Sequence, residues 1–535
     1  MNPKELFNDL LFKALNKQYG AHDKRDVAST ISYCDPKFGE FSTNIAFRLS
    51  KSESCAPAEA AERIIKELNK SKTIKKAEFL PPGFINVIMD NQVWIDYIES
   101  INDDFSRSDI GKGQSIQLEF ISANPTGPLV LTNAWQGYYG DILTNIYNSQ
   151  GYKASTEYLL NDGGNQIASL GKAIQQALGK EFEAEITENL YRGEYIDNIA
   201  EIITTKIGSK DKVLSEEPLE IGSLATKLIV ENYIKPDLAK LGVNFDSMYS
   251  ESEADIKKTL SRLEDAGLIK NKDGAVWIDG DKIGLDQDQV LIRSYDSGES
   301  YFLKDIAYQL ERLEERGYSK TITIVGPDHH GQAIRLVNTL RALGHNDFIE
   351  LSTQTIRLIK DGEEFKMSKR KGNYILLSDF LDEVPTEAAR FYFAMRDTNT
   401  HMDFDIDLVK EHSAKNPVYY SLYAYARACS IQENASKESL SASRIDDYEL
   451  SPSEHQLIMQ LSKVEGILKE IVGNHKVHQL LHQTFDIAKA FHEFYEKERV
   501  VGAKNASQKL TIIEKFKQAY ESIFAIIGVD LLNKM

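Results

Sequence analysis

Cysteine is scarce in this sequence, and its spacing argues against two kinds of site. The 535 residues include only three cysteines, Cys34, Cys55 and Cys429, and no two of them form a C-x-x-C pair. Disulfide frameworks and cysteine zinc sites both need several cysteines at short, regular spacings. The sequence therefore predicts neither, and we expect a protein of a reducing compartment, the cytoplasm.

Long apolar runs and an excess of positive charge are also missing. No segment approaches the ~18 uninterrupted apolar residues of a membrane-spanning helix, so no membrane association is expected. Lysine and arginine number 63 against 81 acidic residues, a formal net charge of −18. This balance excludes a protein that coats nucleic acid through bulk positive charge, and DNA is not an expected partner. Local basic patches stay compatible with it.

The chain has enough apolar sequence for several folded domains. Its 535 residues, 42% of them hydrophobic, are several times the ~100 to 200 residues of a typical domain. Residues 1–105 combine helical and alternating patterns, which predicts a small N-terminal α+β module. Strand-like and helical segments alternate over 106–405, which predicts an α/β domain with a parallel sheet and a ligand site beyond the carboxyl ends of its strands.

Two stretches depart from this alternation. Between about 166 and 285 the period becomes mostly helical, which predicts an insertion within the α/β domain. From 406 to 535 the patterns are helical throughout, and a C-terminal all-α helical bundle is the plain prediction.

A cluster of basic residues lies near the end of the α/β part. The segment 361–373 reads DGEEFKMSKRKGN and places Lys366, Lys369, Arg370 and Lys371 beside Ser368. Ammonium and guanidinium groups in such a loop can stabilise a polyphosphate leaving group, which needs mostly positioning and opposite charge. The alternative is a solvated basic loop, because most charge runs only face water.

The segment VGPDHHG at 325–331 follows a predicted strand and opens a predicted helix. Backbone N–H groups and the helix dipole at such a position favour an anion or ribose hydroxyls. The two adjacent histidines and the aspartate also suggest zinc. We favour the first interpretation, because no third ligand has metal-binding spacing, and no resident metal is predicted.

Several ordered strings give the sequence a family resemblance. KMSKR at 366–370 resembles the signature loop of class I aminoacyl-tRNA synthetases, and EFISANPTGPL at 119–129 resembles the arginyl-tRNA synthetase pattern almost letter for letter. The resemblance continues through further segments in the same order: FGEFSTN, PPGFIN, TEYLLNDGGNQI, YRGEY, SYFLKDIAY, VGPDHHG, MDFDIDL, NPVYYSLYAYAR and FHEFYEKERVVGA. On these strings the chain is identified as a member of that family.

The resemblance implies a fold and an activity. It implies a Rossmann-like catalytic domain over 106–405, an N-terminal module that touches the tRNA elbow, and a C-terminal anticodon-binding bundle. The implied reaction is ATP-dependent activation of L-arginine and its transfer to tRNA(Arg), with Mg²⁺ accompanying ATP. A monomer is expected. Binding of tRNA to so acidic a chain would rest on a narrow basic track and be sensitive to salt.

The resemblance also assigns residues to arginine. Asp305 would be the carboxylate that accepts two parallel N–H bonds from the guanidinium, and Tyr301, one helical turn earlier, would be its neighbour. Glu119, Ser122 and Asn124 would hold the ammonium and carboxylate of the substrate. Taken without the resemblance, Asp305 is as well explained as a helix cap and Tyr301 as a core aromatic.

The remaining assignments concern ATP and tRNA. Those for ATP are Pro125, Thr126, Gly127, Asp328, His329, Met367 and Ser368. Those for the departing pyrophosphate and catalysis are Lys366, Lys369, Arg370 and Asn133. Those for tRNA are Tyr420, Tyr423, Arg427 and Lys504. A tyrosine stripe at this spacing is more often part of a core than a platform for bases, so only the resemblance supports the last group.

One stretch departs from the family pattern. After PTGPL the family has His-x-Gly-His and, two residues later, an arginine. In this chain Val130 and Asn133 stand at the two histidine positions, Thr132 at the glycine position and Trp135 at the arginine position. Val130 donates no hydrogen bond, Asn133 keeps an amide donor, and Thr132 and Trp135 add bulk where adenine would lie. ATP activation is therefore expected to be slow. The alternative function is a binding protein, descended from such an enzyme, that holds tRNA or arginine without activating it.

Overall fold

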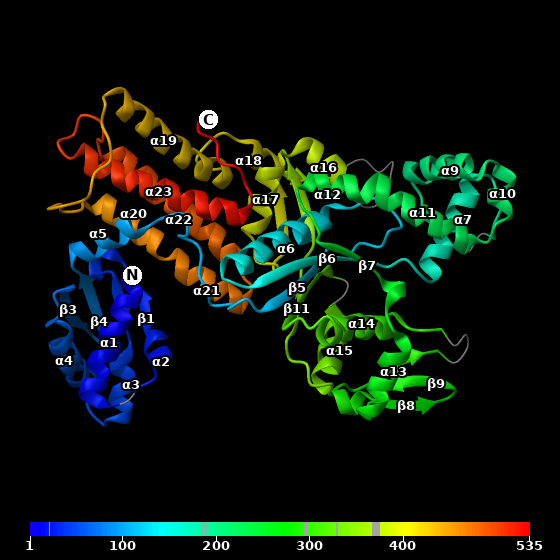
Figure 1. The fold of residues 1–535 in the computed structure, drawn as a ribbon, viewed down its shortest axis with the longest axis horizontal. Coiled ribbons are helices and arrows are strands. Elements are labelled where there is room, and N and C mark those ends of the chain that lie inside the picture. The colour runs from blue at the N-terminus through cyan, green and yellow to red at the C-terminus, as the bar shows by residue number, and fades with distance from the viewer. Residues whose placement is uncertain (21, 184–185, 188–189, 294–297, 328–329, 366–374) are drawn as a thin grey trace.

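The computed structural model describes residues 1–535 except 21, 184–185, 188–189, 294–297, 328–329 and 366–374. The molecule is elongated (Figure 1). The N-terminal module and the C-terminal bundle lie at one end, a group of helices forms the other end, and the central sheet lies between them. Among the helices that are described, none combines the length and the apolar character that crossing a bilayer requires.

The N-terminal module is an antiparallel sheet of strand order β1-β2-β4-β3 packed against helices. Its elements are α1 (Pro3–Tyr19), α2 (Lys24–Ala28), β1 (Ile31–Tyr33), η1 (Pro36–Phe38), β2 (Phe41–Thr43), α3 (Ile45–Ser52), α4 (Pro57–Leu68), β3 (Ile74–Leu80), β4 (Phe84–Met89) and α5 (Asn91–Ser100). The apolar residues of α4 recur at helical spacing, and Ala60, Ala61, Ile64 and Leu68 are buried.

The central sheet has five parallel strands in the order β12-β11-β5-β6-β7. These are β5 (Ser115–Phe120), β6 (Lys153–Leu160), β7 (Ser247–Ser250), β11 (Lys320–Val325) and β12 (Phe348–Ser352), with α6 (Leu131–Ser149) after β5 and α15 (His330–Ala342) after β11. The predicted parallel sheet is therefore confirmed. Since β5 neighbours both β6 and β11, the sequence order reverses direction at β5, which is where doubly wound sheets bind ligands.

The helices at the far end of the molecule interrupt this sheet between β6 and β7 (Figure 1). We call them the insertion: α7 (Asn165–Ala177), α9 (Glu194–Ile207), α10 (Lys210–Ser215), α11 (Pro218–Ile229), the π-helical turn η2 (Val230–Ile234) and α12 (Lys235–Leu241). A side-chain carbon on Gly171 would lie 1.7 Å from the Pro218 carbonyl oxygen, so α7 and α11 can approach this closely only with glycine there.

The region predicted as one helical insertion, about 166–285, contains more than helices. The helices end at Leu241, β7 returns to the central sheet, and a second excursion with its own antiparallel sheet follows. That excursion comprises η3 (Glu251–Glu253), α13 (Ile256–Asp265), β8 (Ile269–Lys272), β9 (Ala275–Ile278), η4 (Gly280–Ile283) and β10 (Gln289–Ile292). A four-residue strand such as β7 is too short for its alternation to be visible between helical patterns.

The rest of the α/β part joins the central sheet to the bundle. Its elements are α14 (Tyr301–Leu310) with its continuation η5 (Glu311–Glu315), β13 (Ile356–Lys360), β14 (Glu363–Glu364), α16 (Leu377–Glu383), α17 (Thr386–Ala394), β15 (Met402–Asp405) and α18 (Ile406–Lys410). The C-terminal bundle comprises α19 (Pro417–Lys437), α20 (Pro452–Ser462), α21 (Val464–Asn474), α22 (His478–Lys497) and α23 (Ala506–Ile527).

Helix α6 lies at the centre of the molecule. It contacts β5 and β6 on one side and α17, α21 and α23 on the other. Gly140 lets the helix lie against the Phe120 ring, where a side-chain carbon would approach to 2.4 Å. Asp141 forms an ion pair with the buried Arg390, which also donates to the Ile527 carbonyl. The sheet and the bundle are therefore joined through α6 together with Arg390 of α17.

The N-terminal module docks on α20 of the bundle. The carboxylate of Glu40, only 6% exposed, accepts from the Trp94 indole N–H at 3.2 Å and lies 2.9 Å from the His455 ring nitrogen of α20. The Asn2 amide donates to the Ser462 carbonyl at 2.7 Å. The N-terminal module is therefore held on the bundle by specific, largely buried polar contacts.

Candidate active site

A cavity of about 550 Å³ opens beyond the carboxyl ends of β5, β6, β11 and β12. We call it the acidic cavity. Helix α14 and the start of α6 line its other sides. Six residues singled out in the sequence line it together: Glu119, Ser122, Asn124, Asn133, Tyr301 and Asp305. The structure thus brings residues up to about 180 positions apart into one site, at the edge of the sheet where a ligand was expected.

Helix α14 presents one face to the cavity. The Ser300 hydroxyl oxygen accepts from the Leu303 N–H at 3.2 Å and so begins the helix at Tyr301. Tyr301, Asp305 and Gln309 follow at intervals of four residues and all line the cavity. This is the spacing at which helical side chains share a face. The predicted pairing of Tyr301 and Asp305 on one face is therefore what the structure has.

Acidic side chains form a row across the sheet beneath α14. In the strand register, Glu157 of β6 is opposite Glu119 of β5, Glu119 is opposite Thr323 of β11, and Thr323 is opposite Glu350 of β12. Aligned residues of parallel neighbours point to the same face of the sheet. Three carboxylates therefore lie in one line under the helix, and two of them, Glu119 and Glu350, line the cavity.

The members of the row differ in protonation. Burial raises the pKa of Glu157, but hydrogen bonds from Arg316, Tyr308 and Ser247 outweigh it and leave this pKa below the usual value. Burial raises the pKa of Glu119 despite the opposing Arg312 guanidinium. Burial, and then the neighbouring charges of Glu119 and Asp305, raise the pKa of Glu350 to about 8.

Glu350 is accordingly protonated at neutral pH in the absence of a ligand. Its Oε1 atom is buried without a hydrogen-bond partner in the part of the chain that is described. A cation entering the cavity would supply the missing partner and favour the ionised form. The cavity is therefore suited to a positively charged ligand with several hydrogen-bond donors.

The backbone turns sharply where β5 ends. Ile121 and Ser122 have φ values of +67° and +38°, a backbone conformation that residues other than glycine rarely adopt. The Ser122 hydroxyl accepts from the Leu159 N–H of β6 at 3.1 Å and so holds this turn against the sheet. Ser122 borders the cavity, but this oxygen is used in the turn. After this strained turn, Ala123 and Asn124 both line the cavity.

The next residues leave the acidic cavity. Pro125, Thr126 and Gly127 are not among its lining residues, and the last two contact the insertion. The Tyr195 hydroxyl of α9 donates to the Thr126 carbonyl at 2.9 Å, and a side-chain carbon on Gly127 would lie 3.2 Å from that hydroxyl. The insertion therefore holds the loop from the side opposite the cavity.

The altered signature occupies the start of α6. Thr132 and Asn133 line the acidic cavity. The Asn133 side-chain oxygen accepts from the Val130 N–H at 2.9 Å, and its amide nitrogen donates to Gln136 at 3.3 Å, which leaves one amide hydrogen for a ligand. Trp135 is fully buried against Phe393 and does not line the cavity. The expectation that Trp135 crowds a nucleotide is therefore wrong, because its ring belongs to the core.

A short ladder joins this segment to the end of the basic segment. The Leu131 N–H donates to the Ile375 carbonyl at 3.0 Å, and the Leu377 N–H donates to the Leu129 carbonyl at 2.9 Å. The predicted residues Lys366, Met367, Ser368, Lys369 and Arg370, and likewise Asp328 and His329, lie outside the described residues. The residues just after the basic segment are nevertheless fixed at the start of α6, beside the cavity.

The four residues predicted to contact tRNA lie in the bundle, away from the cavity. Three belong to α19, where Tyr419 stacks on Tyr423 with ring centroids 5.6 Å apart, and the Arg427 guanidinium lies 4.5 Å from the rings of both Tyr423 and Tyr495. We call Tyr419, Tyr423, Arg427 and Tyr495 the aromatic stack. Tyr420 packs on the neighbouring His492 ring at 4.2 Å, and Lys504 is exposed in the loop before α23.

Several cavity residues gave no sequence signal. Glu251, Gln136, Gln309 and Glu350 all line the acidic cavity, and the Glu251 carboxylate is 4% exposed and pairs with Lys304 at 3.0 Å. Each is a single polar residue in an otherwise ordinary pattern, and only the strand order places it here. Within the described residues no group of three metal-binding side chains occurs.

Comparisons with known proteins cover the whole chain. Residues 5–89 match the arginyl-tRNA synthetase N-terminal domain, residues 101–418 the class I (R) catalytic domain of tRNA synthetases, and residues 421–535 the DALR anticodon-binding domain. The chain is similar to an arginine–tRNA ligase of Anoxybacillus flavithermus, with 36% identity over 96% of each chain. A second such ligase, from Listeria monocytogenes, is 36% identical over 94% of this chain and 93% of its own.

Solved structures show the same fold. An arginyl-tRNA synthetase from Thermus thermophilus aligns with a TM-score of 0.76 at 17% identity, over 100% of both chains. One from Plasmodium falciparum aligns with a TM-score of 0.76 at 15% identity, over 100% of this chain and 99% of its own. The expected α/β fold with a helical C-terminal domain is confirmed.

The protonation of Glu350 leads to a prediction about stability. An unfolded glutamate ionises near pH ~4.3, whereas folded Glu350 does so at about pH 8, so its contribution to stability is full below the lower value and is lost as pH rises to the higher. We expect Glu350→Gln to have the thermal midpoint of the parent near pH 4.5 and an increasingly higher midpoint than the parent up to pH 8. The difference in the free energy of unfolding should grow by at most about 1.4 kcal/mol per pH unit.

The matched control is Glu157→Gln in the same row, whose pKa is shifted the other way. It breaks a buried pair with Arg316 and should lower the midpoint at pH 7. Parallel pH profiles for Glu350→Gln and the parent would show that Glu350 is ionised in the folded protein throughout.

Proposed function

The chain belongs to the arginyl-tRNA synthetase family, and on that basis we propose how its residues divide the work of an arginine–tRNA ligase. The enzyme is a class I synthetase that uses ATP to activate L-arginine and transfers it to tRNA. The arginine carboxylate oxygen attacks the α-phosphorus of ATP, and the bond to the bridging oxygen breaks, releasing pyrophosphate. A terminal ribose hydroxyl of tRNA(Arg) then attacks the arginyl carbonyl carbon, AMP leaves, and the hydroxyl proton is lost.

The ladder between Leu129–Leu131 and Ile375–Leu377 is the observation that carries this assignment. It fixes the residue after the basic segment to the start of α6, directly beside the acidic cavity. A basic group that stabilises pyrophosphate must act within reach of the reacting phosphorus. The ladder supports this placement for Lys366, Lys369 and Arg370, which follow one another shortly before Ile375.

The acidic cavity suits arginine. Asp305 would accept two parallel N–H bonds from the guanidinium, and Tyr301 would fix its plane. Glu119, Asn124 and Ser122 at the carboxyl end of β5 would hold the ammonium and carboxylate, although the Ser122 oxygen is already engaged. A buried row of carboxylates favours a ligand with two cationic groups over a neutral one.

ATP would lie along the start of α6 and the segments that follow β11 and β14. Asn133 keeps one amide hydrogen for a phosphate, and the further contacts would come from Asp328, His329, Met367 and Ser368. Pro125, Thr126 and Gly127 would act by shaping the loop. Mg²⁺ would arrive on the phosphates, where it neutralises charge and needs few protein ligands.

The two terminal parts would hold the tRNA. The aromatic stack and Tyr420 offer rings for unpaired anticodon bases, and Arg427 and the exposed Lys504 offer cations for phosphates. We propose that the chain divides at 1–105, 106–405 and 406–535; the matched stretches, 5–89, 101–418 and 421–535, support three parts in this order. We propose that the enzyme acts as a monomer in the cytoplasm, with neither DNA nor membrane as a partner.

A binding protein without activity is the less favoured function. A tRNA binder needs neither a buried arginine pocket nor a basic segment fixed beside it, and this chain keeps both sequence elements. The deciding experiment is charging of tRNA(Arg) with radiolabelled arginine. Arginine-dependent, ATP-dependent charging is expected; its absence at high enzyme concentration would favour the binding protein.

Asp305 should discriminate arginine from lysine and ornithine. A planar guanidinium paired bidentately with a carboxylate is not reproduced by an ammonium, so Asp305→Ala should weaken arginine binding by about a hundredfold, as expected for an unpaired buried charge. Isothermal calorimetry of the full chain measures this. The exposed Asp281→Ala serves as a control. Equal affinity of the Asp305 variant and the parent would remove Asp305 from the pocket.

Lys369 should act mainly in the transition state. A contact with the leaving pyrophosphate strengthens as charge develops, so Lys369→Ala should lower kcat by about 10² while the KM for arginine changes little. Steady-state kinetics with tRNA present separates the two constants. If the KM for arginine rises as much as kcat falls, the segment has a structural role instead.

The altered signature should limit activation by ATP. A lost preorganised donor typically costs about 10² to 10³ in rate, and Val130 supplies none. Val130→His, Thr132→Gly and Asn133→His together should raise arginine-dependent ATP–pyrophosphate exchange at least about tenfold. Trp135 stays unchanged, because an arginine there would enter the core. A parent that already charges tRNA at about 1 to 10 per second would contradict this limitation.

A further inference from the structure

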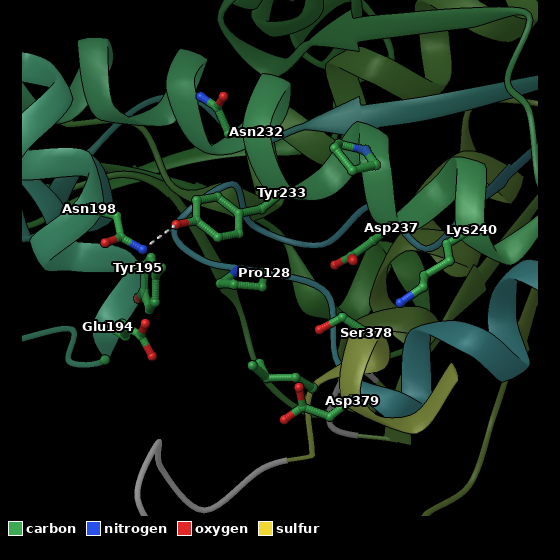
Figure 2. A pocket seen from close by; sticks show the side chains of 13 residues that line it. Pro128, Glu194, Tyr195, Asn198, Asn232, Tyr233, Asp237, Lys240, Ser378 and Asp379 are labelled. Carbon is green, nitrogen blue, oxygen red and sulfur yellow. Dashed lines mark hydrogen bonds between the residues drawn. The ribbon is translucent and has the colours of Figure 1, made fainter. Parts of the chain in front are cut away.

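A second cavity of about 470 Å³ lies beside the loop that follows β5, where Pro128 lines it (Figure 2). We call it the insertion cavity. Three separate parts of the chain form it: the insertion, the loop after β5, and α16, which follows the basic segment. Its residues are Pro128, Gly193, Glu194, Tyr195, Asn198, Asn232, Tyr233, Pro236, Asp237, Lys240, Leu376, Ser378 and Asp379. No role in the reaction so far described uses it.

One loop separates the two cavities. Asn124 borders the acidic cavity, and Pro128, four residues later, borders the insertion cavity. The insertion holds this loop at two points, one before and one after Pro128. Tyr195 donates to the Thr126 carbonyl, and the Asp237 carboxylate accepts from the Leu129 N–H at 3.3 Å. A ligand in the insertion cavity therefore contacts the same loop that borders the acidic cavity.

The aromatic side of the cavity offers a ring surface. The Tyr195 and Tyr233 rings meet edge to face with centroids 6.1 Å apart, and the Asn198 amide donates to the Tyr233 hydroxyl at 3.3 Å, which fixes the second ring (Figure 2). Unstacked nucleotide bases bind on such rings and are read along their polar edges. The cavity also exceeds the ~300 Å³ of the smallest ligand sites.

The polar side of the cavity selects among bases. Three acidic residues, Glu194, Asp237 and Asp379, line the cavity together with Lys240, and Lys240 already pairs with Asp382, which is not a lining residue. Burial raises the pKa of Asp237 to about 6, so it is mostly ionised at neutral pH. The net acidic lining disfavours a phosphate inside and favours an exocyclic amino group. Among pyrimidines, cytosine presents such a donor and uracil presents an acceptor at the same position.

We propose that the insertion cavity binds the unpaired cytosine next to the terminal nucleotide of tRNA, while the terminal ribose enters the acidic cavity. The inference rests on the proposed function, because only a tRNA substrate must bring its end past the loop between the two cavities. The base would lie against Tyr233, its amino group would donate to a carboxylate, and its phosphate would stay outside near Lys240.

The test combines a protein change with an RNA change. Tyr233→Leu removes the ring, Tyr233→Phe keeps it, and Trp277→Leu changes an aromatic residue outside both cavities. Each full-length variant is titrated against full-length tRNA(Arg) transcripts by fluorescence anisotropy at fixed salt. The transcripts carry cytosine, uracil or an abasic residue at the position before the last.

We expect Tyr233→Leu to weaken binding of the cytosine transcript about tenfold and of the abasic transcript by less than twofold. Tyr233→Phe and Trp277→Leu should match the parent, and the uracil transcript should bind the parent several-fold more weakly than the cytosine one. Equal weakening of the intact and abasic transcripts, or none in either, overturns the proposal.

Charging by the parent is measured on the same transcripts and separates this inference from the proposed function. If the parent charges tRNA but Tyr233→Leu weakens the cytosine and the abasic transcripts equally, the enzyme assignment stands and the cavity assignment fails. If Tyr233→Leu weakens the cytosine transcript more than the abasic one but no charging occurs, the cavity assignment stands and the proposed function fails.

Discussion

The buried guanidinium of Arg312 is the contact on which the acidic cavity depends. It is fully inaccessible and donates to the Gln117 side chain at 2.7 Å, to the Gln117 carbonyl at 3.0 Å and to Thr323 at 3.1 Å, so it joins β5, β11 and the end of α14 at one point. With its hydrogen bonds met, the charge offsets the nearby Glu119 and sets the rotation of α14. Tyr301 and Asp305 line the cavity from the same helix whose continuation these hydrogen bonds attach to the sheet.

The same arrangement explains why the cavity tolerates so many acids. Three donors hold the pKa of Glu157 below its usual value, whereas one buried oxygen of Glu350 has no hydrogen-bond partner within the described residues and burial raises the pKa of Glu350 to about 8. One row of the sheet therefore contains both a fixed charge and a group that responds to a ligand. The difference arises from the neighbours of Glu157, which are Tyr308 of α14, Ser247 of β7 and Arg316 just after η5, since all three carboxylates are aligned in the strand register.

The sequence predicts the fold well where signals are local and less well where they are not. Alternating strands and helices indicate the parallel sheet, and the spacing of Tyr301 and Asp305 indicates a shared helix face. The strand β7 escapes notice because four residues carry no visible period. Glu350 and Gln136 cannot be found without knowing which strands are neighbours, and Trp135 looks like part of a site because its sequence neighbours line the cavity while its own side chain points into the core.

The docking of Asn2 and Glu40 onto α20 has a consequence for how the chain is made. The N-terminal module leaves the ribosome first, yet its partner surface on the bundle is synthesised more than 350 residues later. Until then the module must fold on its own and keep the edge around Trp94 from sticking to other chains. Closing this contact is thus a late event in biogenesis, and release of a prematurely ended chain exposes that edge permanently.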